Sequence, residues 1–151
     1  MYTKTLFNRS ILCAALVFLC LYGGQTVQAD STKAPAYLSG YDVVSYFTKQ
    51  KAEQGKPEYA YQYKGKTYWF SGESHKDMFM KNPERYLPEY DGYCAYGVVH
   101  GQKVEASPEA WIIVDNKLYL HTDRSFLEKW KNDTSDSIKK GDEQWSLMNA
   151  E

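Results

Sequence analysis

The chain has 151 residues, of which 43% are hydrophobic and 16% are aromatic, and its formal net charge is −1. The near-neutral charge does not provide the basic surface that nucleic-acid binding requires, so we expect no nucleic-acid partner. The length suits a single folded domain better than two.

The first 29 residues are predicted to be a secretory signal peptide. Two basic residues precede the apolar run ILCAALVFLCLYGG, and the pattern Val27-Gln28-Ala29 suits cleavage before Asp30. A membrane span needs about 20 apolar residues, so we expect no stable span in the mature protein. Bulky residues before Cys20 argue against lipid attachment. The protein is therefore predicted to be periplasmic or secreted.

Removal of this segment leaves 16 basic and 19 acidic residues, together with 12 tyrosines and all four tryptophans. The aromatic side chains can fill a small core in place of disulfides. Cys13 and Cys20 leave with the signal peptide, so Cys94 has no intramolecular disulfide partner. Its thiol is predicted to be free, bound to a ligand or joined to a second chain in a homodimer.

Residues 30–36, DSTKAPA, are predicted to form a flexible lead-in to a domain over residues 37–151. The apolar spacing in YDVVSYFTK predicts a helix over roughly residues 42–48. The stretches EYAYQY and KTYWFS alternate tyrosine with other residues on either side of Lys64-Gly65, which predicts an antiparallel hairpin.

A second helix is predicted from an N-cap at Ser71 to a break at Pro83. A short third helix is predicted between Asp91 as N-cap and Gly101 as C-cap, with Cys94 in its first turn. The stretch WIIVDNKLYLHT predicts another hairpin, and one or two helices follow it. The class is α+β, with two hairpins expected to form one antiparallel sheet and short helices packed around it.

The sequence also contains a weak internal similarity. GKTYWFSGESHKDMFMKN and NKLYLHTDRSFLEKWKND both give a strand, a hydroxyl residue and a helix, at an offset of 51 residues. Tyr68 then matches Tyr119, and Phe79 matches Trp130. The pattern favours two copies of a hairpin-and-helix unit, with coincidence as the alternative.

Several linked motifs resemble those of a known family. The stretches SGYDVVSYF, YKGKTYWFSGESHKDMFMKNPERYLPEYDGYCAYGVVHG and IKKGDEQW occur in the order found in exported single-domain members of the YHS-domain family. The resemblance covers nearly the whole mature chain. It implies a role in metal handling, because related YHS and TRASH-type domains have cysteines thought to bind metal.

The chain departs from those cysteine-containing domains at the cysteine positions. Their Asp-Pro-x-Cys signature corresponds here to Asp42 followed by Ser45, and two further cysteine positions are taken by Ser71 and His75. The resemblance therefore leaves Asp42, His75 and Cys94 as the potential metal ligands.

The chemistry of these side chains favours copper or zinc. A cysteine near a helix N-terminus is favoured as a thiolate, and neutral imidazole is a common metal ligand. A Cys94 and His75 pair suits Cu(I) or Zn(II) better than magnesium or calcium. Each residue also has a structural interpretation: Cys94 as a small buried hydrophobe, His75 as a hydrogen-bonded core residue and Asp42 as an N-cap.

Two other functions remain alternatives to metal handling. Cys94, His75 and an acid could form a cysteine-dependent enzyme, although no further catalytic signature accompanies them, so we expect no enzyme. A tyrosine-rich interaction module without metal is the other alternative. His100 and His121 are expected at surface or strand positions outside the shared site.

Overall fold

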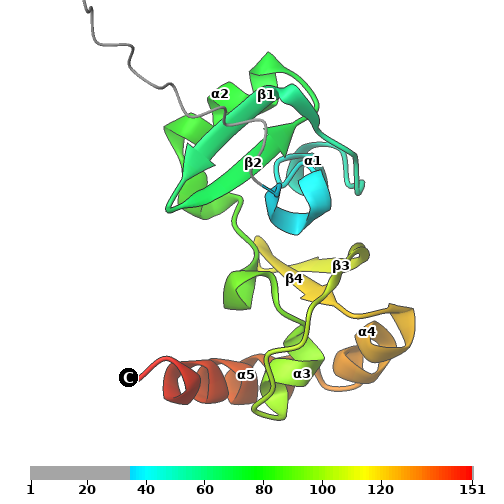
Figure 1. Ribbon diagram of the computed structural model, residues 1–151. Helices are drawn as coiled ribbons and strands as arrows, with labels where there is room; N and C mark the ends of the chain where they lie inside the picture. The colour runs from blue at the N-terminus through cyan, green and yellow to red at the C-terminus, as the bar shows by residue number, and fades with distance from the viewer. Residues whose placement is uncertain (1–34, 151) are drawn as a thin grey trace, which may run out of the picture.

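A computed structural model describes residues 35–150 of the chain (Figure 1). The predicted signal peptide, the cleavage site before Asp30 and nearly all of the lead-in lie outside these residues. Within residues 35–150, no helix combines the length and the apolar character needed to cross a membrane.

The structure confirms the α+β class. Its elements form two successive units with the same order of turn, short helix, hairpin and helix (Figure 1). The first unit, residues 36–87, contains the turn Tyr37–Gly40, α1 (Ser45–Thr48), β1 (Lys56–Tyr63), β2 (Lys66–Phe70), α2 (Glu73–Lys81) and the turn Pro83–Arg85. The second unit, residues 88–150, contains the turn Glu89–Gly92, α3 (Ala95–Val99), β3 (Ser107–Val114), β4 (Lys117–His121), α4 (Arg124–Lys131) and α5 (Thr134–Met148).

The two hairpins have the same register at an offset of 51 residues. Tyr61 pairs with Tyr68 in the first hairpin, and Ile112 pairs with Tyr119 in the second. In each hairpin the register shifts once, near the start of the first strand. Each turn consists of two residues with positive φ. The predicted hairpins and the duplicated unit are therefore confirmed.

The duplication extends further toward the N-terminus than the sequence similarity indicated. Each unit begins with a left-handed turn, with φ of 53°, 53° and 80° at residues 38–40 and 55°, 56° and 83° at residues 90–92. Glycine ends both turns because it adopts positive φ without steric cost.

Asp42 and Cys94 occupy equivalent places, two residues after these glycines. The Asp42 N–H donates to the Glu53 carbonyl at 2.8 Å, and the Cys94 N–H donates to the Val104 carbonyl at 2.8 Å. The repeat therefore places a carboxylate in the first unit where the second unit has a thiol.

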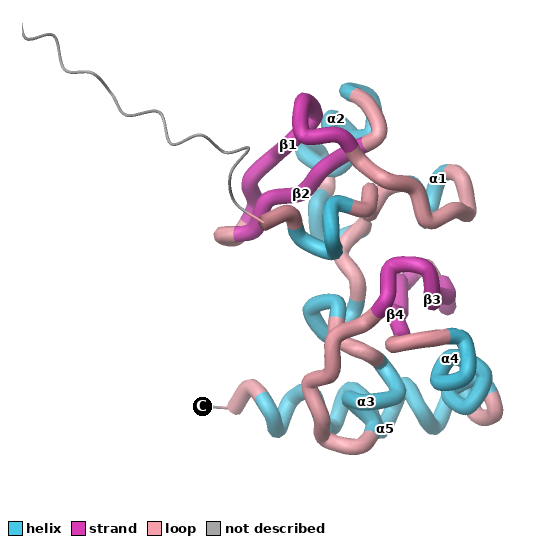
Figure 2. The backbone as a smooth tube through the Cα atoms, turned by 45° about the vertical axis from the view of Figure 1, so that its right-hand side comes forward, coloured by secondary structure: helices cyan, strands magenta, loops and turns pink. Residues whose placement is uncertain are grey.

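The hairpins form two separate two-stranded sheets, so the prediction of one sheet is wrong (Figure 2). In the first unit Ala36 forms a parallel bridge to Thr67 of β2. In the second unit Cys94 forms a parallel bridge to Leu120 of β4. The chain that leads into each hairpin thus pairs with the second strand of that hairpin and occupies this edge of the sheet.

Each unit has an aromatic core of similar design. In the first unit the Phe79 ring lies 4.9 Å from Tyr68 and 5.1 Å from Phe70, measured between centroids. In the second unit the Trp130 ring lies 5.0 Å from Tyr119 and 5.3 Å from His121. Such pairs add to the stabilisation that burial of the rings provides.

The buried ring of Tyr46 joins the two units. It packs with Leu118 and Leu120 of the second hairpin, and its centroid lies 5.1 Å from that of Trp111. Its hydroxyl donates to the Pro108 carbonyl at 2.8 Å. We call this contact the seam.

The helix starts differ from their predicted positions. α1 is shorter than predicted, and α2 has Gly72 rather than Ser71 as its N-cap. α3 begins after Cys94, which is its N-cap, because Asp91 lies in the left-handed turn. Cys94 therefore precedes the first turn of a five-residue helix.

Gly55→Ala tests the close approach of the chain to β2. A Cβ at Gly55 would lie 2.5 Å from the backbone carbonyl carbon and oxygen of Trp69, and backbone cannot rotate away. We expect the free energy of unfolding to fall by about 2 kcal/mol or more. In the control Gly72→Ala the new methyl meets no atom within 4 Å, and the loss should stay below about 1 kcal/mol. Equal losses in chemical denaturation would contradict this assignment.

Candidate functional site

The Asp42 carboxylate is fully buried and accepts three hydrogen bonds. Its Oδ1 accepts from the Val44 N–H at 2.9 Å, and its Oδ2 accepts from the Ser71 N–H at 2.8 Å. The third donor is Nδ1 of His75, 2.6 Å from Oδ2. A buried carboxylate is stable only when it is paired and hydrogen-bonded, and these three donors meet that need.

The contact with Asp42 fixes the orientation of the His75 ring. An ionised carboxylate only accepts hydrogen bonds, so Nδ1 carries the proton. The other ring nitrogen, Nε2, lies 3.3 Å from the Thr48 hydroxyl oxygen, which also lies 3.0 Å from the Val44 carbonyl. Thr48 is exposed, and the His75 side chain is 12% exposed, so Nε2 lies close to solvent.

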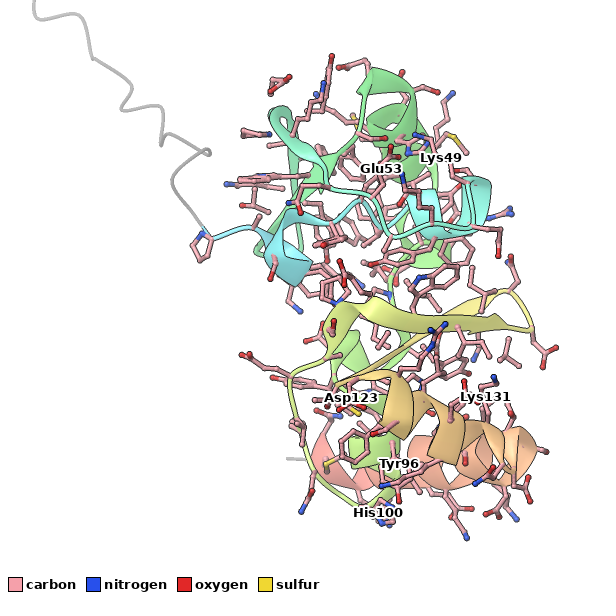
Figure 3. All side chains as sticks on the ribbon, turned by 90° about the vertical axis from the view of Figure 1, so that its right-hand side faces the viewer. Lys49, Glu53, Tyr96, His100, Asp123 and Lys131 are labelled. Atoms are coloured by element: carbon pink, nitrogen blue, oxygen red, sulfur yellow. The ribbon has the colours of Figure 1, made fainter. Side chains whose placement is uncertain are left out.

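Polar contacts continue from His75 to the surface. The Ser71 hydroxyl lies 3.2 Å from His75 Nδ1 and 3.5 Å from the Lys49 ammonium. Lys49 in turn contacts the Glu53 carboxylate at 2.5 Å, and the two side chains meet in Figure 3. We call Asp42, His75, Ser71, Lys49 and Glu53 the polar chain.

Cys94 lies apart from the polar chain. It is a free cysteine, 2% exposed, and its backbone pairs with Val104 and Leu120 in the second unit. Within residues 35–150, no three histidine, cysteine, aspartate or glutamate side chains are grouped to hold a metal ion. The structure thus brings Asp42 and His75 together, but Cys94 does not join them.

The duplication explains this separation. Asp42 and Cys94 are counterparts in two units that each pack their own aromatic core, so the repeat places the carboxylate in one unit and the thiol in the other. Among the described residues, no hydrogen bond links the Cys94 thiol to an imidazole: His75 contacts Asp42, and neither ring nitrogen of His121 has a partner.

Two surface hollows lie away from the polar chain. One, of about 500 Å³, lies where the two left-handed turns approach each other and is lined by Tyr37, Lys66 and Asp91 among others. The other, of about 360 Å³, lies between β1 and α2.

Comparison of the chain with known protein families, with curated proteins and with solved structures gives no match. The resemblance to the YHS-domain family accordingly stays a prediction from the motifs.

His121, which was expected at a surface or strand position outside the shared site, is a strand residue with an unusual environment. It ends β4 and is fully buried, and neither ring nitrogen has a hydrogen-bond partner. Its counterpart at the 51-residue offset is Phe70, so a polar ring occupies a core position that is apolar in the first unit. Burial lowers the pKa of His121 from 6.5 to about 4. By contrast, His100 is exposed, beside Tyr96 (Figure 3).

Asp42→Ala tests how far the first unit depends on the buried carboxylate. The substitution leaves two backbone donors and the His75 N–H without their acceptor, so we expect a loss of about 3 kcal/mol or more in the free energy of unfolding. Asp77→Asn, on the exposed face of α2, is the control and should change stability by less than about 0.5 kcal/mol. Similar losses for both variants would show that Asp42 is replaceable.

His121→Phe tests the cost of burying a neutral imidazole. Because its pKa is lower in the folded chain than in the unfolded chain, the free energy of unfolding is unaffected by His121 above pH 6.5 and declines as the pH falls from 6.5 to about 4. The shift corresponds to about 3 kcal/mol. Denaturant unfolding at several pH values should show that the free energy of unfolding falls less steeply toward acid pH in the variant. The new phenylalanine matches Phe70, the residue at the equivalent position of the first unit, and it does not titrate. Parallel pH profiles for the variant and the wild type would contradict this role.

Proposed function

We propose that this protein is an exported metal-handling domain of the YHS type, which binds zinc or copper at an open site with His75 Nε2 as its protein ligand. The observation that carries the proposal is the 2.6 Å contact between His75 Nδ1 and the buried Asp42 carboxylate. Metal-binding histidines commonly donate their other ring N–H to a carboxylate, which fixes the tautomer and raises the basicity of the ligand nitrogen. Asp42 then orients His75 and does not itself contact the metal.

The arrangement of the predicted positions also supports this location. The resemblance places Ser71 and His75 where metal-binding relatives have cysteines, and here these side chains lie 3.2 Å apart beside Asp42. A hydroxyl and an imidazole replace two thiols. Imidazole and oxygen donors suit Zn(II) and Cu(II), whereas Cu(I) favours thiolate.

The donors present are too few to enclose an ion. Structural zinc sites normally use four protein ligands, and this arrangement offers one imidazole with neutral hydroxyls close by. A bound ion would complete its coordination with water, a small ligand or a second copy of the chain. Such an open site suits the exchange of metal rather than a contribution to folding.

A general-base function is the second candidate, and one observation favours it. Thr48 Oγ1, the His75 ring and the Asp42 carboxylate follow one another at 3.3 Å and 2.6 Å, which is the order of a hydroxyl nucleophile, a base and an orienting acid. Thr48 has a competing interaction, because its hydroxyl also lies 3.0 Å from the Val44 carbonyl. The thiol-dependent alternative has less support, since Cys94 lies apart from His75.

His75→Asn tests the metal site in the exported protein. The asparagine amide can replace the Nδ1–H donor to Asp42 but removes Nε2, so we expect Zn(II) and Cu(II) affinity to fall by at least about tenfold with the fold retained. Asp42→Asn should lower affinity by about 10- to 100-fold through loss of ring orientation. Competition titration with a metal-binding dye measures both effects, and circular dichroism checks the fold.

Cys94→Ser is the matched control, because Cys94, although a candidate ligand from the sequence, does not belong to the polar chain. Its metal affinity should equal that of the wild type. If Cys94→Ser abolishes binding while His75→Asn binds normally, the site assigned to His75 is refuted.

A further inference from the structure

The outer edge of β1 is open to a further strand. Within residues 35–150, β2 is the only strand that pairs with β1, and it lies between β1 and the second unit (Figure 1). Tyr63 and Lys66 pair directly beside the two-residue turn. Because bonded and non-bonded pairs alternate along an antiparallel ladder, the N–H and C=O groups of Ala60 and Gln62 point away from β2. No backbone hydrogen bond from another described segment reaches them.

The hollow of about 360 Å³ between β1 and α2 lies directly beside this edge. Its β1 side includes Ala60 and Gln62, the residues with the outward backbone groups. Its α2 side is one face of the helix, formed by Glu73, Lys76, Asp77 and Met80. Domains that bind peptides by strand addition combine main-chain hydrogen bonds at an edge with pockets for alternate side chains. The edge of β1 and the hollow together supply both parts.

The charges on the α2 side of the hollow favour a basic side chain. The Lys76 ammonium lies 3.7 Å from a Glu73 carboxylate oxygen, so these two charges offset each other. Asp77 is exposed and forms no ion pair with another described residue, which leaves one negative charge at the hollow. Met80, 47% exposed, and the half-buried Tyr61 ring offer apolar surface to the aliphatic stem of an arginine or lysine.

The second unit uses the same positions for a contact within the chain. The counterparts of Ala60 and Gln62 at the 51-residue offset are Trp111 and Ile113, and both pack against the buried ring of Tyr46 at the seam. In the first unit these positions have only a methyl group and an exposed amide. This part of the first hairpin is therefore accessible to a partner.

We propose that the edge of β1 binds an extended segment of a partner protein as an added strand, with a basic side chain of that segment in the hollow beside Asp77. The backbone of the segment pairs with Ala60 and Gln62, which provides affinity, and the basic side chain provides selectivity. Because every second side chain of a strand lies on the same face, the preferred segment alternates basic residues with β-branched ones. The binding does not depend on the metal site, since His75 does not line the hollow.

The probe is a short capped peptide that alternates valine with arginine, and fluorescence anisotropy measures its binding to the exported protein. We expect saturable binding, and the same peptide with glutamate in place of arginine should bind at least about tenfold more weakly. Methylation of alternate peptide amides should weaken binding by about tenfold in one register and have little effect in the other, because only one set of amides faces β1.

Asp77→Lys should lower affinity for the arginine peptide by about tenfold, since a like charge then faces the basic side chain. Glu143→Lys, the same change of charge at an exposed position of α5, is the control and should leave affinity nearly unchanged at physiological ionic strength. Equal losses in both variants, equal binding of the peptides methylated in either register, or no saturable binding would refute the proposal. A dimer in sedimentation that Asp77→Lys dissociates would assign the edge to a second copy of the chain and would also refute it.

Discussion

The first unit depends on satisfying one buried charge. Asp42 takes a carboxylate into the core, where it must find donors, and it finds them at the start of α1, at the start of α2 and on the His75 ring. These donors come from segments about 30 residues apart in the sequence, so the carboxylate also fixes how the segments meet. The same contacts orient His75, so the stability of the unit and any chemistry of the imidazole both depend on the Asp42 carboxylate.

The second unit has the same backbone arrangement as the first but differs at two buried side chains. Cys94 takes the place of Asp42, and His121 takes the place of Phe70. The first change removes the charge from the turn, and the second puts an imidazole without a partner into the aromatic core. The two units therefore share hairpin register, turn geometry and ring packing, while their polar side chains differ.

Patterns that act locally in the sequence predicted the fold well. Alternating tyrosines and turn residues located both hairpins, and the 51-residue similarity identified the repeat. The separation of the sheets was missed, because the bridges from Ala36 and Cys94 come from irregular segments without periodicity. At the site, the pairing of Asp42 with His75 depends on long-range contacts. His121 was expected at a surface or strand position and does end β4, and its burial could have been found from its alignment with Phe70.

The seam couples the unfolding of the two units. Tyr46 belongs to the first unit by sequence, yet its ring completes the packing of Leu118 and Leu120 on the second hairpin. Losing either unit would expose this ring and leave the Pro108 carbonyl without its donor. Two copies with separate sheets would otherwise unfold as independent bodies. Shared packing of this kind couples them, so amide protons in both hairpins should exchange with solvent through a common opening of the chain.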